Sequence, residues 1–337
     1  MPTIEALNPD VPLYARTGIN LASAGLGARP VSCSNAFFAP VSRMLQDSEA
    51  VFIADKFDDN GKWMDGWETE RRRNGGHDHA VIQLARAGRV LGFDIDTSHF
   101  TGNYAPACKV EATSTTGPID DSTTWVPILN HSPLGPSSHH FFPCQSFESW
   151  THLRLHIYPD GGVARFRVFG VPELDATDQG QQIDLVSSLN GGRVLAFSDA
   201  HYGDYMRLLA PGRGINMGDG WETRRRREPG YDWIVLALGA RGIIEHVIVD
   251  TAHFKGNFPD RFSLQAADLQ NFGDGLTDAL VTDAMFWNTL VPEQKLGPNA
   301  EHDYTDAVTD MGPVTHVRLN IFPDGGVSRL RLFGRPA

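Results

Sequence analysis

The chain has 337 residues, 41% of them hydrophobic and 21% charged, which is typical of a globular protein and unlike a disordered or fibrous one. Its 29 lysines and arginines against 41 aspartates and glutamates give a net charge of −12. This argues against general binding to nucleic-acid backbones, but it leaves room for a local cationic pocket that takes a small anion.

The sequence also argues against a membrane or secreted protein. Its longest strongly apolar stretch, near residues 233–238, is far too short to span a bilayer, and the N-terminus lacks the pattern of a signal peptide. The three cysteines, Cys33, Cys108 and Cys144, are odd in number and widely spaced. We therefore expect a cytoplasmic protein with reduced thiols, no disulfides and no membrane partner.

The predicted elements, in chain order, are mostly strands. A helix is expected at residues 38–53, then strands at 90–96, 152–158 and 163–169, the last two joined as a hairpin by a Pro-Asp-Gly-Gly turn. The second half repeats the strands near 243–250 and the hairpin around residues 323–326, and a second helix is expected at 276–285. Four arginines alternate with apolar residues on the hairpin strands, which predicts a polar sheet face there: Arg165, Arg167, Arg329 and Arg331.

The same pattern is written twice in the chain. Residues 65–73 (DGWETERRR) return as 219–227 with eight of nine identical, and residues 96–104 return as 250–258 at the same offset of 154. Residues 151–170 return as 315–334. We expect two tandem homologous domains, 1–172 and 173–337, with the boundary in the polar stretch 172–182. Each is predicted to be an all-β, antiparallel β-sandwich of about 150 residues.

The runs of arginine are the most unusual feature of the repeated segments. They are unexpected in an acidic chain, and a guanidinium group binds a carboxylate through two hydrogen bonds. We therefore consider them candidate anion-binding residues: Arg71, Arg72 and Arg73 in the first copy, Arg225, Arg226 and Arg227 in the second. The alternative is a solvated edge strand whose arginines pair with Glu68 or Glu222.

The second repeated segment, Asp-Thr-x-His-Phe-x-Gly-Asn, ends a strand and enters a loop. His99 and Asn103, or His253 and Asn257, could face a pocket, because histidine transfers protons near neutral pH and asparagine binds carbonyl or amide groups. The alternative is that this segment only locks the loop in place.

Other histidines are weaker candidates. His77 and His79 have the i, i+2 spacing that points two imidazoles to one side of a strand, as a metal site needs, but the second copy has Tyr231 and Trp233 instead. His140 and His302 match between the copies. No nucleotide-binding, zinc-protease or serine-hydrolase motif is present, so no cofactor is predicted, and support for a divalent metal is weak.

These motifs in duplicate resemble the allantoicase (allantoate amidinohydrolase) family over residues 19–334. The resemblance implies a hydrolase acting on carbon–nitrogen bonds in linear amidines (EC 3.5.3.4), which converts allantoate to (S)-ureidoglycolate and urea in purine breakdown. It also implies two jelly-roll sandwiches similar to galactose-binding domains, and a homo-oligomer, typically a hexamer.

The residues suggest roles in that reaction. An arginine of either cluster would hold the substrate carboxylate, and Asn103 or Asn257 a ureido arm. His99 or His253 would be the general acid, and Glu68 or Glu222 the base. Displacement and elimination through an imine both stay open.

Two alternatives also stay open. A non-enzymatic, lectin-like protein would stack sugars on Trp63, Trp125 or Trp287 if these are exposed, although the arginine clusters and the lack of a secretion signal oppose it. Alternatively, one repeat has become a scaffold, as the exchange of His77 for Tyr231 allows.

Overall fold

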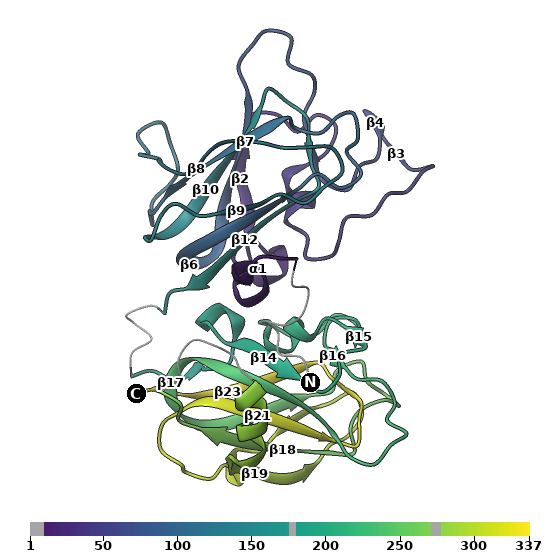
Figure 1. Cartoon of the computed structure of the whole chain (residues 1–337), viewed down its shortest axis with the longest axis vertical. Coiled ribbons are helices and arrows are strands. Elements are labelled where there is room, and N and C mark those ends of the chain that lie inside the picture. Colours follow the sequence, from purple (N-terminus) through teal and green to yellow (C-terminus); the bar gives the residue numbers. More distant parts are fainter. Residues whose placement is uncertain (1–9, 175–179, 271–277) are drawn as a thin grey trace. The chain divides into compact units, whose positions relative to one another are not determined.

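The computed structural model describes residues 10–174, 180–270 and 278–337. The chain forms two compact units, one of Val11–Glu173 and the other mainly of Leu174–Ala337 (Figure 1). Among the described helices, none is long and apolar enough to cross a membrane.

The first unit contains one short α-helix, twelve strands and two 3-10 turns in its described part. They are, in order, α1 Leu13–Thr17, β1 Ile19–Asn20, η2 Ala24–Leu26, β2 Arg29–Cys33, η3 Val41–Leu45, β3 Phe57–Asp58, β4 Gly61–Lys62, β5 Trp67–Glu68, β6 Asp78–Asp96, β7 Ala107–Thr113, β8 Val126–Pro133, β9 Phe141–Pro143, β10 Ser149–Tyr158, β11 Gly162–Val163 and β12 Arg165–Pro172.

The second unit repeats the main strands in the same order, with differences in the short elements. Its elements are β13 Ile183–Asp184, η5 Ser188–Asn190, β14 Arg193–Phe197, β15 Tyr202–Gly203, η6 Tyr205–Leu209, β16 Trp221–Glu222, β17 Asp232–Asp250, β18 Arg261–Ala267, α2 Asp278–Asp283, η7 Ala284–Phe286, β19 Asn288–Lys295, β20 Glu301–Asp303, η8 Thr305–Ala307, β21 Val314–Phe322, β22 Gly326–Val327 and β23 Arg329–Pro336.

The long strand β6 belongs to both layers of the first sandwich. Its first residues pair with β2 and β10, and β10 continues the layer through β7 to β8. Its last residues pair with β12 and β9, and β12 pairs with β1. The strand passes between the layers near Gly88, where a side chain would collide with the backbone of Val171. β17 does the same in the second unit, so the predicted tandem, antiparallel β-sandwiches are confirmed.

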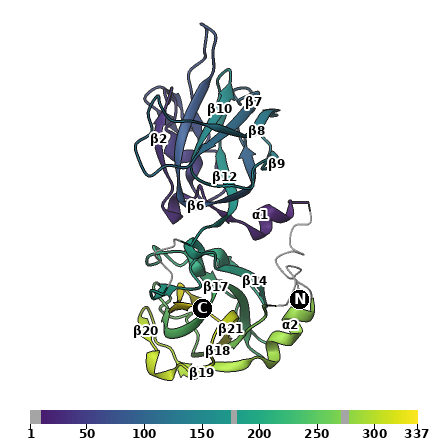
Figure 2. The same ribbon diagram turned by 90° about the vertical axis from the view of Figure 1, so that its left-hand side faces the viewer.

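Each sandwich closes around its own apolar core. Leu153 and Phe166, from opposite layers of the first unit, are fully buried, as are Leu319 and Leu330 in the second. The second unit has an additional layer, because α2 and η7 pack on the outer side of β14 and β17 through Leu280 (Figure 2). The helix predicted at 276–285 is confirmed over Asp278–Asp283, after which a 3-10 turn follows, and residues 276 and 277 lie outside the described part.

The two predicted hairpins are wrong. β10 and β12 are joined by the predicted turn but pair with different parts of β6, so the turn carries the chain from one layer to the other. β21 and β23 flank β17 in the same way. At these two turns, the long strands before and after the turn are therefore not neighbours in a sheet.

The helix predicted at residues 38–53 is also wrong. Only η3 forms there, and beyond it Arg165 donates hydrogen bonds to the carbonyl oxygens of Ser48 (2.7 Å) and Glu49 (3.3 Å). A buried guanidinium from β12 thus binds carbonyl groups that a helix would have bonded internally. The predicted polar sheet face exists, but Arg165 and Arg329 on it are buried.

Candidate active site

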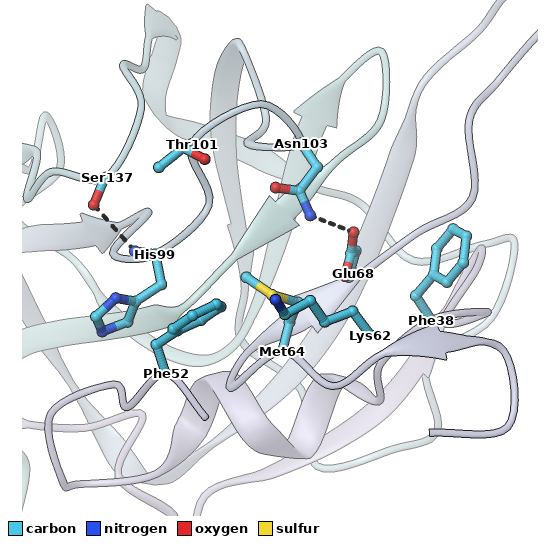
Figure 3. A pocket seen from close by; sticks show the side chains of 9 residues that line it. All are labelled: Phe38, Phe52, Lys62, Met64, Glu68, His99, Thr101, Asn103 and Ser137. Atoms are coloured by element: carbon cyan, nitrogen blue, oxygen red, sulfur yellow. Dashed lines mark hydrogen bonds between the residues drawn. The ribbon is translucent and has the colours of Figure 1, made fainter. Parts of the chain in front are cut away.

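A pocket of about 430 Å³ lies in the first unit where β5 approaches the loop after β6 (Figure 3). It contains three of the residues singled out in the sequence, Glu68, His99 and Asn103, together with six others. Its full lining is Phe38, Phe52, Lys62, Met64, Glu68, His99, Thr101, Asn103 and Ser137.

Short strand β5 fixes the position of Glu68. The neighbouring Trp67 is fully buried and its indole N–H donates to the carbonyl of Asn35 (2.8 Å). Glu68 pairs with Gly162 of β11, and its backbone N–H donates to the carbonyl of Ala39 (3.2 Å). The Glu68 carboxyl is consequently held at the pocket wall with only 8% of the residue exposed.

Asn103 lies opposite Glu68 and binds it directly. Its side-chain Nδ2 donates a 2.6 Å hydrogen bond to Glu68 Oε1, and its backbone carbonyl accepts a hydrogen bond from Gly162 N (2.7 Å). Burial raises the pKa of Glu68, and the bond from Asn103 only partly offsets this. Glu68 is therefore a carboxyl group that takes up a proton more readily than an exposed glutamate.

His99 also reaches the pocket, at a backbone φ of 69°. Its ring Nε2 is 3.0 Å from the carbonyl oxygen of Ala50, and the ring stacks on Phe52 at 5.9 Å. Because a carbonyl only accepts, Nε2 carries a proton, and Nδ1 is the nitrogen left for exchange. The ring thus anchors the loop at Ala50 as well as lining the pocket.

The second unit repeats this arrangement in part. Asn257 donates a short hydrogen bond to Glu222 Oε1, and His253, at φ 71°, places Nε2 2.7 Å from the carbonyl oxygen of Gly214. Here the Asn257 amide also lies 3.9 Å from the sulfur of Met217, and Glu222 is partly exposed. The duplicated sequence motif is therefore a duplicated Glu–Asn–His arrangement with different surroundings.

The first arginine cluster lies beside this pocket and does not line it. Arg71, Arg72 and Arg73 border an adjacent hollow of about 630 Å³, which shares only Phe38 with the Glu68 pocket. Arg72 donates from Nε (3.0 Å) and Nη2 (2.9 Å) to the buried Asp78. The structure thus gives the central arginine a partner inside the protein.

The second cluster repeats this pattern. Arg226 pairs with the buried Asp232 at 2.7 Å. Arg225 and Arg227 are exposed, as Arg71 and Arg73 are. A ligand role for the outer arginines stays a prediction.

The second pair of matched histidines binds the backbone through both ring nitrogens. His140 Nδ1 donates to the carbonyl of Ile95 (2.8 Å) and Nε2 accepts from Gly135 N (2.7 Å). His302 binds Val249 and Gly297 identically. These imidazoles hold a loop in place. Because both ring nitrogens are hydrogen-bonded to the backbone, neither is free for proton transfer.

His77 and His79 lie on the outer face of the β6–β10 sheet, and the pocket lining does not include them. His77 Nε2 is 2.8 Å from His156 Nδ1, and the ring of His79 is 5.8 Å from that of His156. The two side chains do project to one side, as their spacing predicts.

One group among the described residues brings three metal-ligating side chains together: Glu49, Asp96 and His139. The guanidinium of Arg167 lies 3.0 Å from Glu49 and 3.8 Å from Asp96. A cation thus already neutralises these carboxylates, and the group carries no argument for a metal.

None of the three tryptophans proposed for sugar stacking is fully exposed. Trp63 and Trp287 are buried, and Trp125 is covered by the guanidinium of Arg154 at 4.4 Å. This removes the main structural support for a lectin-like surface.

Comparison with known proteins agrees with the duplicated architecture. The family model described as "Allantoicase repeat" matches residues 19–173 and again 183–337. The chain belongs to the allantoicase family. A "Probable allantoicase" from Rhizobium meliloti is 57% identical over 97% of this chain and 96% of its own length. One from Ralstonia nicotianae is 54% identical over 99% and 98%. The crystal structure of an allantoicase from Saccharomyces cerevisiae has 37% identity and a TM-score of 0.80, covering 94% of this chain and 93% of that one.

Sequence reasoning missed six residues of the pocket of this allantoicase-family chain. Phe52, Lys62 and Met64 come from a segment that the second repeat does not match, so a search for duplicated motifs passes over them. The sequence feature that could have indicated these residues is the difference in loop length between the two repeats.

Proposed function

We propose that this protein hydrolyses allantoate to (S)-ureidoglycolate and urea, using the Glu68 pocket of the first repeat. Relatives named as probable allantoicases, 51% to 57% identical over nearly the whole chain, support the reaction. The observation that supports the location is a buried carboxyl of raised pKa, held by an amide in a pocket that also contains a histidine.

The reaction exchanges one bond at the central carbon of allantoate, which carries a carboxylate and two ureido groups. The bond from this carbon to one ureido nitrogen breaks, and a bond to the oxygen of water forms. The leaving nitrogen gains a proton and becomes urea, while the water loses a proton. Direct displacement and elimination to an imine that then adds water need the same two proton transfers.

Glu68 is the base in this proposal. Asn103 binds Oε1, which leaves Oε2 to take the proton of water. Asn103 also offers its amide to a ureido arm. His99 is the general acid, delivering a proton from Nδ1 of the imidazolium to the departing nitrogen while Nε2–H stays on Ala50.

The direct test is release of urea and ureidoglycolate from allantoate by the purified protein. Glu68→Gln keeps the size of the side chain and removes its basicity, so we expect urea release to fall at least a hundredfold with the fold intact. Absence of urea from the wild-type reaction would reject the proposed function.

We also propose a cytoplasmic homo-oligomer, a hexamer, with no nucleic-acid or membrane partner. The resemblance to the family supports the assembly, and the net charge of −12 supports the absence of nucleic acid. Light scattering at micromolar concentration tests it, and a particle of 37 kDa would contradict it.

A further inference from the structure

One wall of the Glu68 pocket is built by a segment that only the first repeat has. Ala50 and Gly214 are equivalent, since they bind His99 and His253. Asp65 and Asp219 are also equivalent, at the start of the repeated DGWET segment. Fourteen residues separate the first pair of landmarks, 50 and 65, and four separate the second, 214 and 219, a difference of ten. The additional residues form the β3–β4 ribbon.

This ribbon brings a lysine into the pocket. Lys62 is the last residue of β4, and Figure 3 shows its side chain extending among those of Met64, Phe52 and Glu68. Its ammonium nitrogen lies 4.6 Å from the centre of the Phe52 ring, which favours a cation over its face. Among the described residues, Lys62 is the one lysine or arginine in the lining of this pocket.

The Lys62 ammonium group contacts an aromatic ring but no carboxylate in the described part of the chain. Within residues 10–174, 180–270 and 278–337, it forms no salt bridge, whereas Arg72 and Arg165 each bind an aspartate. Allantoate brings a carboxylate into a pocket whose wall already holds the Glu68 carboxyl. Two negative groups in a partly desolvated space repel each other unless a cation lies between or beside them.

We propose that Lys62 binds the carboxylate of allantoate, and that the inserted ribbon confines turnover to the first repeat. This rests on the proposed function, and it replaces the arginine clusters as the carboxylate-binding group. The second repeat lacks the ribbon and has Met217 against Asn257. It does have a lysine, Lys255, at the position of Thr101, which makes Lys255 the residue to test against Lys62.

The experiment compares allantoate with its methyl ester, which keeps both ureido groups and loses the negative charge. For Lys62→Met we expect KM for allantoate to rise at least tenfold, kcat to change less than threefold, and KM for the ester to equal that of the wild type. Lys62→Arg should recover part of the affinity for allantoate. An unchanged KM in Lys62→Met, or an equal loss on acid and ester, would overturn the proposal.

Lys56→Met is the matched control, since Lys56 belongs to the same inserted segment but lies over Trp63 at 3.8 Å, outside the pocket lining. It should leave KM unchanged, and a tenfold rise would mean that the general charge of the segment acts, not a contact by Lys62. Lys255→Met should also leave KM unchanged, and a tenfold rise would overturn the assignment of turnover to the first repeat.

Binding without turnover gives an independent measurement. Calorimetric titration of allantoate into Glu68→Gln and into Glu68→Gln/Lys62→Met, both checked by thermal melting, should show at least tenfold weaker binding to the double variant. Equal binding to both would overturn the proposal. If the wild type releases urea and Lys62→Met is unaffected, only this inference is wrong. If the wild type releases no urea, the proposed function itself is wrong.

Discussion

The ring of Phe100 fills the space that a side chain at residue 162 would need, so that a Cβ atom on Gly162 would overlap it. Phe254 and Gly326 have the same relationship in the second repeat. Gly162 also donates its backbone N–H to the carbonyl of Asn103. The Pro-Asp-Gly-Gly turn therefore supports the loop that carries the Glu68 partner, which explains physically why the two motifs occur together in each half.

Gly162→Ala should reduce both stability and activity. The added methyl must displace a fully buried ring, which costs about 1 to 3 kcal/mol of unfolding free energy. Because the displaced loop ends at Asn103, we expect kcat to fall as well. Urea unfolding followed by tryptophan fluorescence measures the first effect, and urea release the second.

Gly102→Ala is the matched control, since a Cβ there meets nothing within 4 Å and the backbone φ is not positive. It should be nearly neutral. A Gly162→Ala protein as stable as the wild type would show that Phe100 relaxes without cost.

The two copies of the Glu–Asn pair should contribute unequally. Glu68 is buried in a pocket walled by the inserted ribbon, whereas Glu222 is partly exposed. We expect Glu68→Gln to lower kcat/KM at least a hundredfold and Glu222→Gln to leave more than half of it. Likewise, His99→Ala and His253→Ala should differ in residual activity more than tenfold. Two equal sites would instead leave about half the activity after either change.

The activity should fall on the acid side at a pH above that of an ordinary glutamate. A base must be deprotonated, and burial raises the pKa of Glu68 from 4.5. The hydrogen bond from Asn103 lowers that pKa, so Asn103→Ala should move the acid limb of kcat/KM to higher pH. Profiles for both proteins between pH 4 and 8 test this. If the acid limb of kcat/KM stays in place or moves to lower pH in Asn103→Ala, this limb reports the titration of a group other than Glu68.

Much of this arrangement can be read from the sequence, because duplication marks it. The strand-rich composition and the internal repeat are visible in the sequence. The Glu–His–Asn set occurs once in each repeat with the same spacing. The features that the sequence did not predict depend on contacts with residues far along the chain. The region at residues 38–53 is not a helix because Arg165 binds its carbonyl groups, and Lys62 was missed because it lies in the unmatched insertion. Pairing across β6 likewise has no local signal.

Arg72 should be important for stability more than for substrate binding. Although burial raises the pKa of Asp78, hydrogen bonds from Arg72 and Ser34 hold it below its ordinary value. Arg72→Ala leaves this buried carboxylate without its guanidinium, which we expect to cost about 1 to 3 kcal/mol. Arg72→Ala/Asp78→Asn should recover part of the loss in urea unfolding. A tenfold higher KM with unchanged stability would restore the interpretation as a substrate-binding residue.

The outer sheet face of the first repeat has a network centred on the carboxylate of Glu111, where the second has amide and hydroxyl groups beside the cation Arg318. Glu111 accepts hydrogen bonds from Lys109 (2.7 Å), Arg154 and His156 (2.9 Å). Burial raises the pKa of Glu111, but these bonds outweigh it and lower the pKa to about 2. In the second repeat, Asn320 instead donates to Ser263 and Gln265. The same strands therefore accept either set of side chains.

Glu111→Gln alone should lower stability by about 1 to 3 kcal/mol, because Arg154 and Lys109 lose their carboxylate. The triple variant Lys109→Ser/Glu111→Gln/His156→Asn copies the second repeat at these three positions and should recover part of the loss in urea unfolding at pH 7. If Glu111→Gln is neutral, or if the triple variant is no better, solvent replaces the network without cost.

The pH dependence of the triple variant gives the sign of the His156 contribution. Burial lowers the pKa of His156 from 6.5 to about 4, so the folded protein favours the neutral ring. A depressed folded pKa gives stability that is complete above pH 6.5 and declines as the pH falls toward 4. The Tm of the wild type should therefore decrease more than the Tm of the triple variant when the pH is lowered from 7 to 5. Parallel losses would show that His156 does not differ in pKa between the folded and unfolded chain.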